Sequence, residues 1–436
     1  MKYAAYKILS GLPNGALYGA SFRRSRRLHA DFLASGDQAG FVTRFREQAL
    51  AQALARARAT PFYARQGIGR TLADFPLIDK ATVLDNFEAL LHSRHAADLV
   101  TTGGTSGKPL AFYIDKNRKG AEWYWMTTGW ACVGFELGRS WRAVLRNHAL
   151  GERISVDNPL LREVCFDNFK LGQEYLRQVT AVIAARALPF VHAYPSAAYT
   201  LASFWHEHDC KPPSVRAFLC GSENVFPFQK ALIQGTLGIR MLTWFGHSEK
   251  LILAHEGAQC ENYHANPFYG ITELLDEAGQ AVAPGASGEL VGTGFINTRM
   301  PFVRYRTGDH AHYVGEHCPD CGHIGTTFRA VQGRWSGDRI YRADGNVVTT
   351  TALNLHDAIY KRLNGLQYHQ HRKGALEIWV VPGDNWDSAA EQELLAHLKM
   401  KVPVGLDFSV KPVKEVAYGA NRKYQLLMQH VDKEQG

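Results

Sequence analysis

The feature that most constrains the fold is an alternation of short apolar segments with longer amphipathic ones, which begins at about residue 98. Short apolar runs predict strands, and segments with apolar residues three and four apart predict helices. This alternation is typical of a mostly parallel sheet that is covered by helices on both faces. The expected strands are 111–115, 141–146, 190–194, 215–220 and 239–245, and the expected helices between them are 166–188 and 195–208.

The segments on either side follow other patterns. Residues 1–75 predict helices, and after residue 270 several strands crowd together as in a β-rich subdomain. The stretch 332–345, QGRWSGDRIYRADG, is rich in Gly and charge and indicates a linker. We therefore predict an α/β fold with a large N-terminal domain (1–333), built from mixed or parallel sheets sandwiched by helices plus the β-rich part. A small α+β C-terminal domain (334–436) would follow on a hinge.

Composition sets the broad class. Hydrophobic residues make up 46% of the 436 residues and charged residues 21%, which are values of a globular protein. No apolar run reaches the roughly 20 residues of a membrane span, and the first residues show no export signal, so we expect a cytoplasmic protein. The seven cysteines are odd in number and lie mostly in apolar contexts, which favours reduced thiols.

The positive charge is concentrated at the N-terminus. Residues 1–70 hold twelve Lys and Arg against three acidic residues, which gives this segment +9, while the whole chain carries +8. This segment could contact an anionic membrane surface, or its arginines could simply form the solvated face of helices. No nucleic-acid motif accompanies the charge, so we expect no nucleic-acid partner.

One loop and three short motifs carry chemistry. The loop TTGGTSGKPL (101–110) offers backbone N–H groups, hydroxyls and a lysine to phosphate oxygens, but it lacks the P-loop spacing and precedes a strand. A plain hairpin loop would look the same. The motifs are GSEN (221–224), WFGHSEK (244–250) and RYRTGDH (304–310). The first two directly follow expected strands, where α/β sheets bind ligands, but each motif alone could be ordinary turn chemistry.

The order of these motifs, followed by GRWSGD (333–338), resembles the adenylate-forming superfamily of acyl-CoA synthetases and ligases. Within it the chain looks most like the phenylacetate–CoA ligase branch, and is similar to adenylating proteins encoded with capsular and surface polysaccharide genes. The resemblance runs from about residue 61 to the C-terminus.

The resemblance implies roles for residues in each motif. The loop would close over the β- and γ-phosphates of ATP, Gly221 to Glu223 would lie along the adenine, and Phe245 would stack on the base. Ser248 would lie near the α-phosphate, Glu249 would bind Mg²⁺, and Asp309 would bind the ribose hydroxyls. The implied nucleotide-binding residues are Thr102, Gly103, Gly104, Thr105, Ser106, Gly107, Lys108, Gly221, Ser222, Glu223, Phe245, Gly246, His247, Asp309 and Arg334. His247 could instead contact the substrate carboxyl group or cap a turn.

Two of the implied elements depart from the family pattern. The family's hinge reads GR followed by an acidic pair, whereas GRWSGD leaves Ser336 or Asp338 as the pivot after Arg334. The family's catalytic lysine stands in a Gly-Lys-aromatic context, whereas here Lys423 follows Arg422 and precedes Tyr424. Lys423 would stabilise the transferring α-phosphate, with Lys108, Ser248 and Glu249 as the other catalytic residues.

The implied activity is ATP-dependent, AMP-forming activation of a carboxylic acid, followed by transfer to CoA. Direct transfer to an amine or hydroxyl of a sugar or peptide is the alternative in the polysaccharide-linked proteins. A non-catalytic nucleotide-binding scaffold is the alternative of another class. The implied cofactors are ATP, Mg²⁺ and CoA.

A separate pattern indicates a metal. Cys318-Pro-Asp-Cys321 is a CxxC knuckle, and CENYH supplies Cys260 and His264. These four residues could hold a closed, structural Zn²⁺ ion, and the resembling subfamily also carries them. His255, His317 and His323 lie near enough in sequence to rival His264.

The acid-binding pocket is less determined by the sequence. Aromatic residues near the expected strand ends, together with His148, could line it or could belong to the core. The aromatic candidates are Trp123, Trp125, Tyr194 and Trp244.

Overall fold

The structure is a computed structural model, and it describes most of the chain. The described residues are 9, 11–101, 110–146, 148–223, 225, 227–332, 339–350, 353, 359, 362–383, 385–417 and 426–431. No helix in these ranges is long and apolar enough to cross a membrane.

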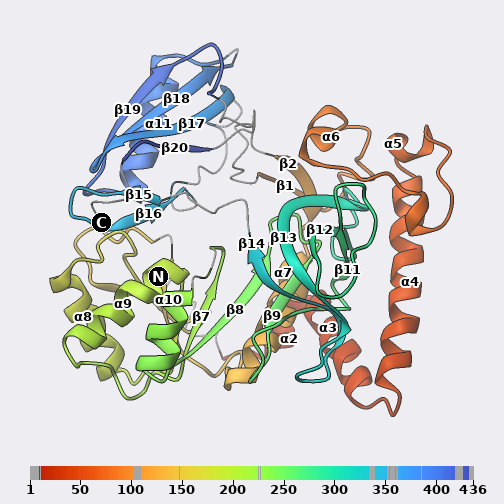
Figure 1. The fold of residues 1–436 in the computed structure, drawn as a ribbon, viewed down its shortest axis with the longest axis horizontal. Helices are drawn as coiled ribbons and strands as arrows, with labels where there is room; N and C mark the ends of the chain where they lie inside the picture. The colour runs from red at the N-terminus through yellow and green to blue at the C-terminus, as the bar shows by residue number, and fades with distance from the viewer. Residues whose placement is uncertain are drawn as a thin grey trace.

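The described part of the chain contains a twelve-stranded mixed sheet, which confirms the predicted α/β class (Figure 1). One half is parallel except for its edge strand β4; its order from that edge is β4 (Ser155–Asn158), β5 (Glu163–Phe166), β3 (Arg142–Leu145), β6 (Phe190–Ala193), β7 (Ala217–Gly221) and β8 (Arg240–Gly246). The antiparallel half continues with β9 (Leu253–Glu256), β10 (Tyr263–Ala265), β14 (Ile324–Gln332), β13 (Tyr305–His317), β12 (Ser287–Gly294) and β11 (Gly270–Leu275).

The β-rich part is therefore continuous with the parallel part. Strand β9 pairs with β8, so that Trp244 lies opposite His255 and Gly246 opposite Leu253. The sequence predicted strands in this region but did not predict this pairing. The expected strand 111–115 is β2 (Ala111–Asp115), and it pairs with β1 (Ala97–Thr101) in a separate hairpin.

Helices cover the sheet as the sequence predicts. The helices α8 (Gln173–Ala185) and α9 (Pro195–Glu207) share a hydrophobic core with the parallel strands. The expected helix 166–188 begins only at Gln173. Asp167 accepts backbone N–H groups from Leu150 and Phe169 and so fixes a loop ahead of the helix.

The N-terminal segment is helical, as expected. Its helices are α2 (Asn14–Leu17), α3 (Gly19–Leu33), α4 (Gln38–Arg58) and α5 (Pro61–Ala64). Asp37 caps α4 by accepting the N–H of Gly40 at 2.8 Å. Further along the chain lie α6 (Lys80–Asp85), α7 (Arg118–Trp130) and α10 (Pro227–Lys230), and α10 continues into a π-helical turn at Ala231–Thr236.

The C-terminal residues form a sheet of their own (Figure 1). Its order is β19 (Asp407–Pro412), β18 (Ala375–Pro382), β17 (Leu363–Arg372) and β20 (Leu427–Gln429), and a hairpin of β15 (Arg339–Tyr341) and β16 (Val347–Thr349) precedes it. Apolar residues of α11 (Ser388–Lys401) join those of the sheet in one core, which also includes Phe169. The predicted boundary at 333/334 and its hinge residues Arg334, Ser336 and Asp338 lie outside the described residues, so this division stays a prediction.

Candidate active site and candidate metal centre

The motif WFGHSEK begins on β8 and continues into the turn after it. Phe245 is half-buried, and its ring lies 6.1 Å from that of His247. The backbone N–H of Ile252 donates to Nε2 of His247 at 3.2 Å, so the ring proton must be on Nδ1. That Nδ1 lies 3.1 Å from Oε2 of Glu249, to which it can therefore donate. Ser248 is exposed in the same turn.

Glu249 joins two of the predicted motifs. The residue is only 7% exposed, and Oε1 accepts a hydrogen bond from the hydroxyl of Tyr305 at 3.2 Å. Tyr305 belongs to the motif RYRTGDH on β13, 56 residues further along the chain. A buried carboxylate held by two donors is fixed in position and offers oxygen ligands of the kind that hard cations take. The sequence alone predicts no role for Tyr305.

Asp309 lies on the same strand as Tyr305. Residues 305, 307, 309 and 311 are buried, whereas the residues between them are more exposed, so Asp309 faces the same side of β13 as Tyr305. Its backbone N–H donates to Thr307 Oγ1 at 3.1 Å. The preceding Gly308 has a φ of 74°, a conformation that favours glycine.

The motif GSEN follows β7, next to β8. Gly221 is paired with Trp244, and a Cβ atom at Gly221 would lie 2.4 Å from the indole ring, so this contact requires glycine. Ser222 has a φ of 71°, and its hydroxyl accepts a hydrogen bond from Arg146 at 2.9 Å. Glu223 is half-buried. The pairing of β7 with β8 thus places the segment 221–223 beside the start of WFGHSEK.

Other predicted residues lie outside the described part of the chain. These are the loop residues Thr102, Gly103, Gly104, Thr105, Ser106, Gly107 and Lys108, the hinge residue Arg334, and Lys423. The loop is bracketed by the paired residues Thr101 and Ala111, which end and begin the two strands of the β1–β2 hairpin.

The four predicted metal ligands lie together. Cys260, His264, Cys318 and Cys321 each place a ligand atom within 4.8 Å of the other three. His264 is on β10, and Cys318 directly follows β13. The rival His255 has its Nδ1 3.0 Å from the carbonyl oxygen of Glu256, and His323 has its Nε2 3.2 Å from that of Ala265.

The geometry of this cluster fits zinc. The distances are 3.5 Å between Sγ of Cys260 and Cys318, 3.6 Å from Cys260 Sγ to His264 Nε2, and 3.3 Å from Cys321 Sγ to that nitrogen. Tetrahedral zinc with Zn–S bonds of about 2.3 Å and Zn–N bonds of about 2.0 Å separates its ligand atoms by about 3.5–3.8 Å. Burial lowers the pKa of His264 to about 3, so the imidazole is neutral and has a lone pair to offer. Asn262 donates to Cys318 Sγ at 3.5 Å and so supports the cluster.

The aromatic candidates for the acid pocket do not all lie together. Tyr194 and Trp244 both contact Arg146, with the guanidinium carbon 4.7 Å and 5.8 Å from their ring centres. Trp123 lies near the buried Arg142, 5.4 Å from the guanidinium carbon to the ring centre. Trp125 instead stacks on Phe268.

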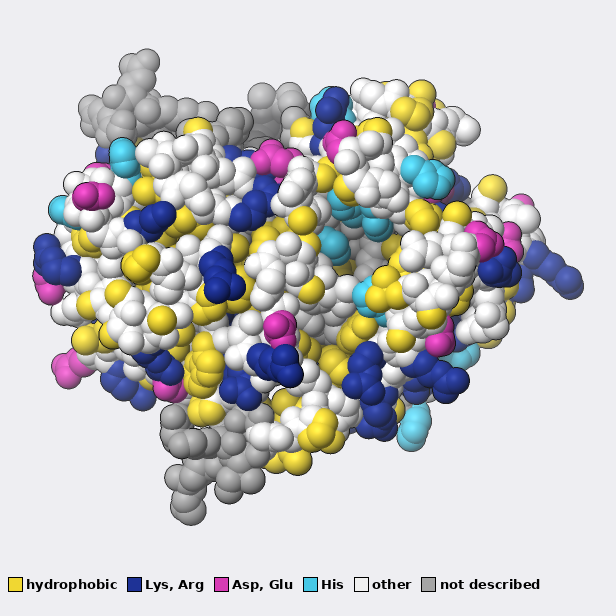
Figure 2. Space-filling view, turned by 90° about the horizontal axis from the view of Figure 1, so that it is seen from below, with side chains coloured by type: hydrophobic (Ala, Val, Ile, Leu, Met, Phe, Trp, Pro, Cys, Tyr) yellow, Lys and Arg dark blue, Asp and Glu magenta, His cyan; other side chains and the backbone are white. Residues whose placement is uncertain are grey.

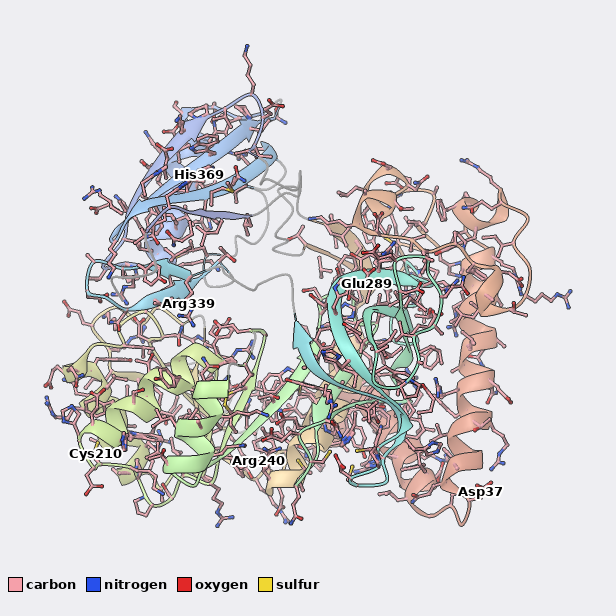
Figure 3. All side chains as sticks on the ribbon, viewed as in Figure 1. Asp37, Cys210, Arg240, Glu289, Arg339 and His369 are labelled. Carbon is pink, nitrogen blue, oxygen red and sulfur yellow. The ribbon has the colours of Figure 1, made fainter. Side chains whose placement is uncertain are left out.

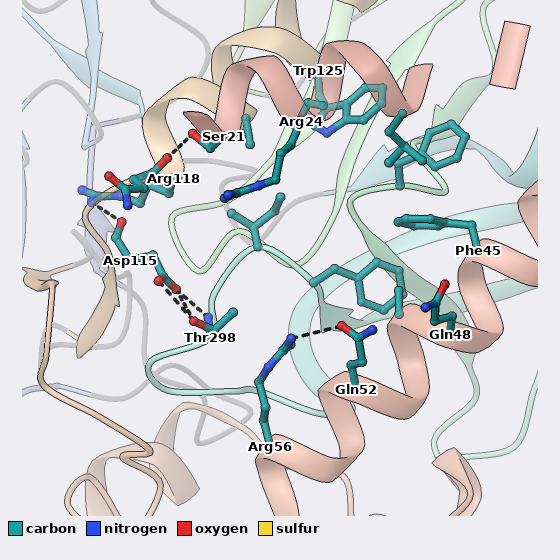
Figure 4. A pocket seen from close by; sticks show the side chains of 18 of the residues that line it. Ser21, Arg24, Phe45, Gln48, Gln52, Arg56, Asp115, Arg118, Trp125 and Thr298 are labelled. Atoms are coloured by element: carbon teal, nitrogen blue, oxygen red, sulfur yellow. Dashed lines mark hydrogen bonds between the residues drawn. The ribbon is translucent and has the colours of Figure 1, made fainter. Parts of the chain in front are cut away.

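Trp125 and Phe268 line a cavity of about 570 Å³ between α3, α4 and α7 (Figure 4). Arg24, Gln52 and Arg56 lie at this cavity, which contains none of the residues implied by the adenylate-forming motifs. Arg24 belongs to α3, whose Arg23, Arg24, Arg26 and Arg27 are all exposed. Figure 2 shows Lys and Arg side chains spread over one face of the molecule, between hydrophobic and polar ones.

Solved structures of an acyl-CoA ligase share the fold of this chain. The chain is similar to 2-hydroxyisobutyryl-CoA ligase in complex with 2-HIB-AMP and CoA in the thioesterification state, with a TM-score of 0.54 and 17% identity over 88% of each chain. It is similar to the same enzyme in the postadenylation state with R3-HIB-AMP, with a TM-score of 0.51 and 16% identity over 92% of this chain and 90% of the other. No protein-family model and no curated protein matches the chain. At this level of identity the likeness establishes the fold alone, which is shared with the solved structures of 2-hydroxyisobutyryl-CoA ligase.

Proposed function

We propose that this protein activates a carboxylic acid with ATP, forming an acyl-adenylate and pyrophosphate, and then transfers the acyl group to the thiol of CoA. The observation that carries the proposal is the hydrogen bond from Tyr305 to Glu249. It joins the two motifs that the resemblance assigns to magnesium and to the ribose, on a fold shared with an acyl-CoA ligase. Two turn motifs that occurred by chance would not be expected to lie in contact in the folded chain.

The proposed chemistry needs positioning and charge more than covalent catalysis. The substrate carboxylate attacks the α-phosphorus of ATP and pyrophosphate departs. Glu249 is the proposed ligand of Mg²⁺, which would neutralise phosphate charge when bound. Asp309 would accept hydrogen bonds from the ribose hydroxyls, and Lys423 would offset negative charge on the α-phosphate.

The acceptor can be CoA, as for the ligase of the same fold, or an amine or hydroxyl of a sugar or peptide. CoA is the default acceptor of the resembling family, and the resemblance to proteins of surface polysaccharide gene clusters supports the second acceptor class as the alternative. A non-catalytic scaffold is supported by the altered hinge sequence GRWSGD and by Arg422 in place of the family's glycine. The retained Glu249, Asp309 and Lys423 support an enzyme.

Exchange of radiolabelled pyrophosphate into ATP tests the proposal, because only adenylate formation supports it. A panel of aliphatic, aromatic and dicarboxylic acids would be assayed with Mg²⁺, with a no-acid reaction and EDTA as controls. Exchange that depends on one class of acid is expected. Mass analysis after adding CoA or candidate amines then identifies the acceptor. Tight ATP binding without exchange for any acid would favour the scaffold.

We also propose that Cys260, His264, Cys318 and Cys321 bind one structural Zn²⁺ ion. The proposal is supported by three ligand-atom separations of 3.3, 3.5 and 3.6 Å, which are close to those of a tetrahedral zinc site. Four protein ligands would leave no open coordination position, which favours a structural ion. Such an ion would tie β10 to the end of β13 rather than take part in adenylation.

A further inference from the structure

A guanidinium group stands where three parallel strands end beside the candidate active site. Arg146 directly follows β3; its Nη1 lies 2.7 Å from Nε2 of His192 on β6, and its Nη2 donates to the hydroxyl of Ser222 after β7 at 2.9 Å. Its guanidinium carbon lies 4.7 Å from the ring centre of Tyr194. No Asp or Glu in the described part of the chain forms an ion pair with Arg146, so its contacts there are all with neutral groups or ring faces.

His192, which contacts Arg146, has a ring N–H group with no acceptor among the described residues. A guanidinium group only donates, so Nε2 of His192 must accept and its proton must be on Nδ1. Burial, followed by the charges of Arg146 and Arg142, lowers the pKa of His192 well below its usual value, so the ring stays neutral. Nδ1 is buried and has no hydrogen-bond partner among the described residues.

Two further buried donors of this neighbourhood lack acceptors. The ring of Trp130 lies 5.0 Å from that of His192 and 5.5 Å from that of Trp244, and its Nε1 has no partner among the described residues. The guanidinium carbon of Arg142 lies 5.5 Å from the Trp130 ring centre, and its Nε likewise has no hydrogen-bond partner among the described residues. Buried donors without acceptors are costly, and here they lie behind the half-buried Arg146, whose described contacts include no carboxylate.

We propose that Arg146 binds a second anionic group, a carboxylate, on the acid that this protein activates, with Ser222 and His192 orienting the guanidinium. This inference rests on the proposed function. Ser222 belongs to the motif beside Trp244 and WFGHSEK, which places Arg146 next to the site of adenylation. The faces of Tyr194 and Trp244 orient a planar guanidinium, whose in-plane N–H groups suit a carboxylate. The predicted substrates are therefore dicarboxylic acids.

The test uses pairs of acids that differ only in the second carboxylate. Adipate would be compared with hexanoate, and terephthalate with benzoate, by pyrophosphate exchange. The kcat/KM ratio of dicarboxylate to monocarboxylate is expected to be about 10- to 100-fold for the unmodified protein and to fall to near one in Arg146→Leu. Arg153→Leu is the matched control, because Arg153 is exposed and lies on the same segment. Its ratio is expected to be unchanged.

A charge reversal separates recognition from a structural role. Arg146→Glu is expected to prefer 6-aminohexanoate to adipate, because the new carboxylate attracts a cation and repels a second anion. A residue that only held the Ser222 turn would lower activity with all acids alike. Melting temperatures of all variants show whether each is folded, and Arg146→Lys provides a charge-preserving variant if the others unfold.

Each outcome bears on one of the two proposals. A ratio near one in the unmodified protein, or an unchanged ratio in Arg146→Leu, overturns the second-carboxylate site and leaves the proposed function standing. A rise in KM for ATP that is equal with every acid assigns Arg146 to a phosphate of ATP and also overturns it. No exchange with any acid removes the proposed function. Calorimetric binding of adipate to the unmodified protein and to Arg146→Leu then decides the site, and equal or absent binding rejects it.

Discussion

The two ends of β13 carry different chemistry. Near its first residues, Tyr305 and Asp309 face the candidate active site, where Tyr305 holds Glu249. Directly after its last residue, Cys318 begins the candidate metal centre. The strand has 13 residues, so its ends are separated by up to about 40 Å. One end presents oxygen atoms, suited to hard cations and hydroxyls, whereas the other presents sulfur and imidazole nitrogen, suited to zinc.

The two ends also differ in how they are assembled. The metal cluster takes all its ligands from two short segments, 260–264 and 318–321, that lie on neighbouring parts of one sheet. The candidate active site combines residues on and directly after β7, β8 and β13, and the resemblance would add the loop residues 102–108 and Lys423, which lie outside the described residues. A site built from one rigid region suits stability, and a site built from many regions suits a reaction that needs movement. Variants should therefore separate stability from activity.

The largest effect is expected at the metal end. Cys318→Ser should reduce zinc from about one ion per chain to near zero and lower Tm by more than about 5 °C, because structural zinc sites bind with about 10 kcal/mol or more. Mass spectrometry of the native protein and calorimetry measure these values. Cys210→Ser, a change at a cysteine outside the cluster, should keep the zinc. Full zinc and an unchanged Tm in Cys318→Ser would refute the centre.

For the proposed adenylation chemistry, Lys423→Ala should strongly lower activity without affecting stability. We expect adenylate formation to fall about 100- to 1000-fold, because a positive charge at the α-phosphate acts mainly in the transition state. Transfer from supplied acyl-adenylate should continue. Lys414→Ala is the control, since Lys414 is an exposed lysine of the same segment. Unimpaired exchange in Lys423→Ala would remove this residue from catalysis.

A graded loss is expected around Glu249. Glu249→Gln should lower pyrophosphate exchange about 100-fold and raise the Mg²⁺ concentration needed for half-maximal rate, because it removes the charge of the proposed ligand. Tyr305→Phe should lower exchange about 10-fold by removing one hydrogen bond to that carboxylate. Tyr313→Phe removes a hydroxyl that donates to Glu316 on the same strand, and should have no effect on the Mg²⁺ dependence. Equal behaviour of the two tyrosine variants would contradict the role of Tyr305.

The sequence predicts those features that depend on local periodicity and spacing. The alternation of strands and helices is local, so it predicts the α/β class and most of the parallel strands. The CxxC knuckle and CENYH are local patterns as well, and the structure brings their four predicted ligands together.

Features that depend on pairing between distant segments could not be predicted. The joining of the β-rich part through β8 and β9 is one of them. Arg146 is another, because its partners His192 and Ser222 lie 46 and 76 residues away. Tyr305 belongs to a recognised motif, but its contact with Glu249 spans 56 residues. Periodicity contains no information on such pairs.

The smallest effect is expected at a second cluster that resembles a metal site only in composition. His369, His371 and His430 place ring nitrogens within 4.8 Å of one another on the C-terminal sheet, where Figure 3 labels His369. The rings of His371 and His430 are stacked 4.2 Å apart at 7°, so their in-plane lone pairs run side by side and do not converge. The side-chain oxygen of Gln367 accepts the backbone N–H of Ala417 at 2.8 Å and lies 3.0 Å from Nε2 of His369. Because this oxygen can only accept, Nε2 of His369 is the donor and has no lone pair for a metal.

This second cluster should affect stability in acid rather than hold a metal. Burial, followed by the neighbouring His430 and His371, lowers the pKa of His369 to about 4 from the 6.5 of an unfolded chain. Between pH 4 and 6.5 this histidine therefore binds more protons in the unfolded state than in the folded state. Its contribution to the free energy of unfolding is fully present above pH 6.5 and is lost as the pH drops towards 4. His369→Gln should flatten the dependence of Tm on pH in this window, whereas His95→Gln, a change at an exposed histidine, should not. Zinc should stay at about one ion per chain in His369→Gln. A loss of metal in His369→Gln would show that these parallel imidazoles rearrange to bind a metal ion. The histidine cluster would then be a metal site like the one at the end of β13.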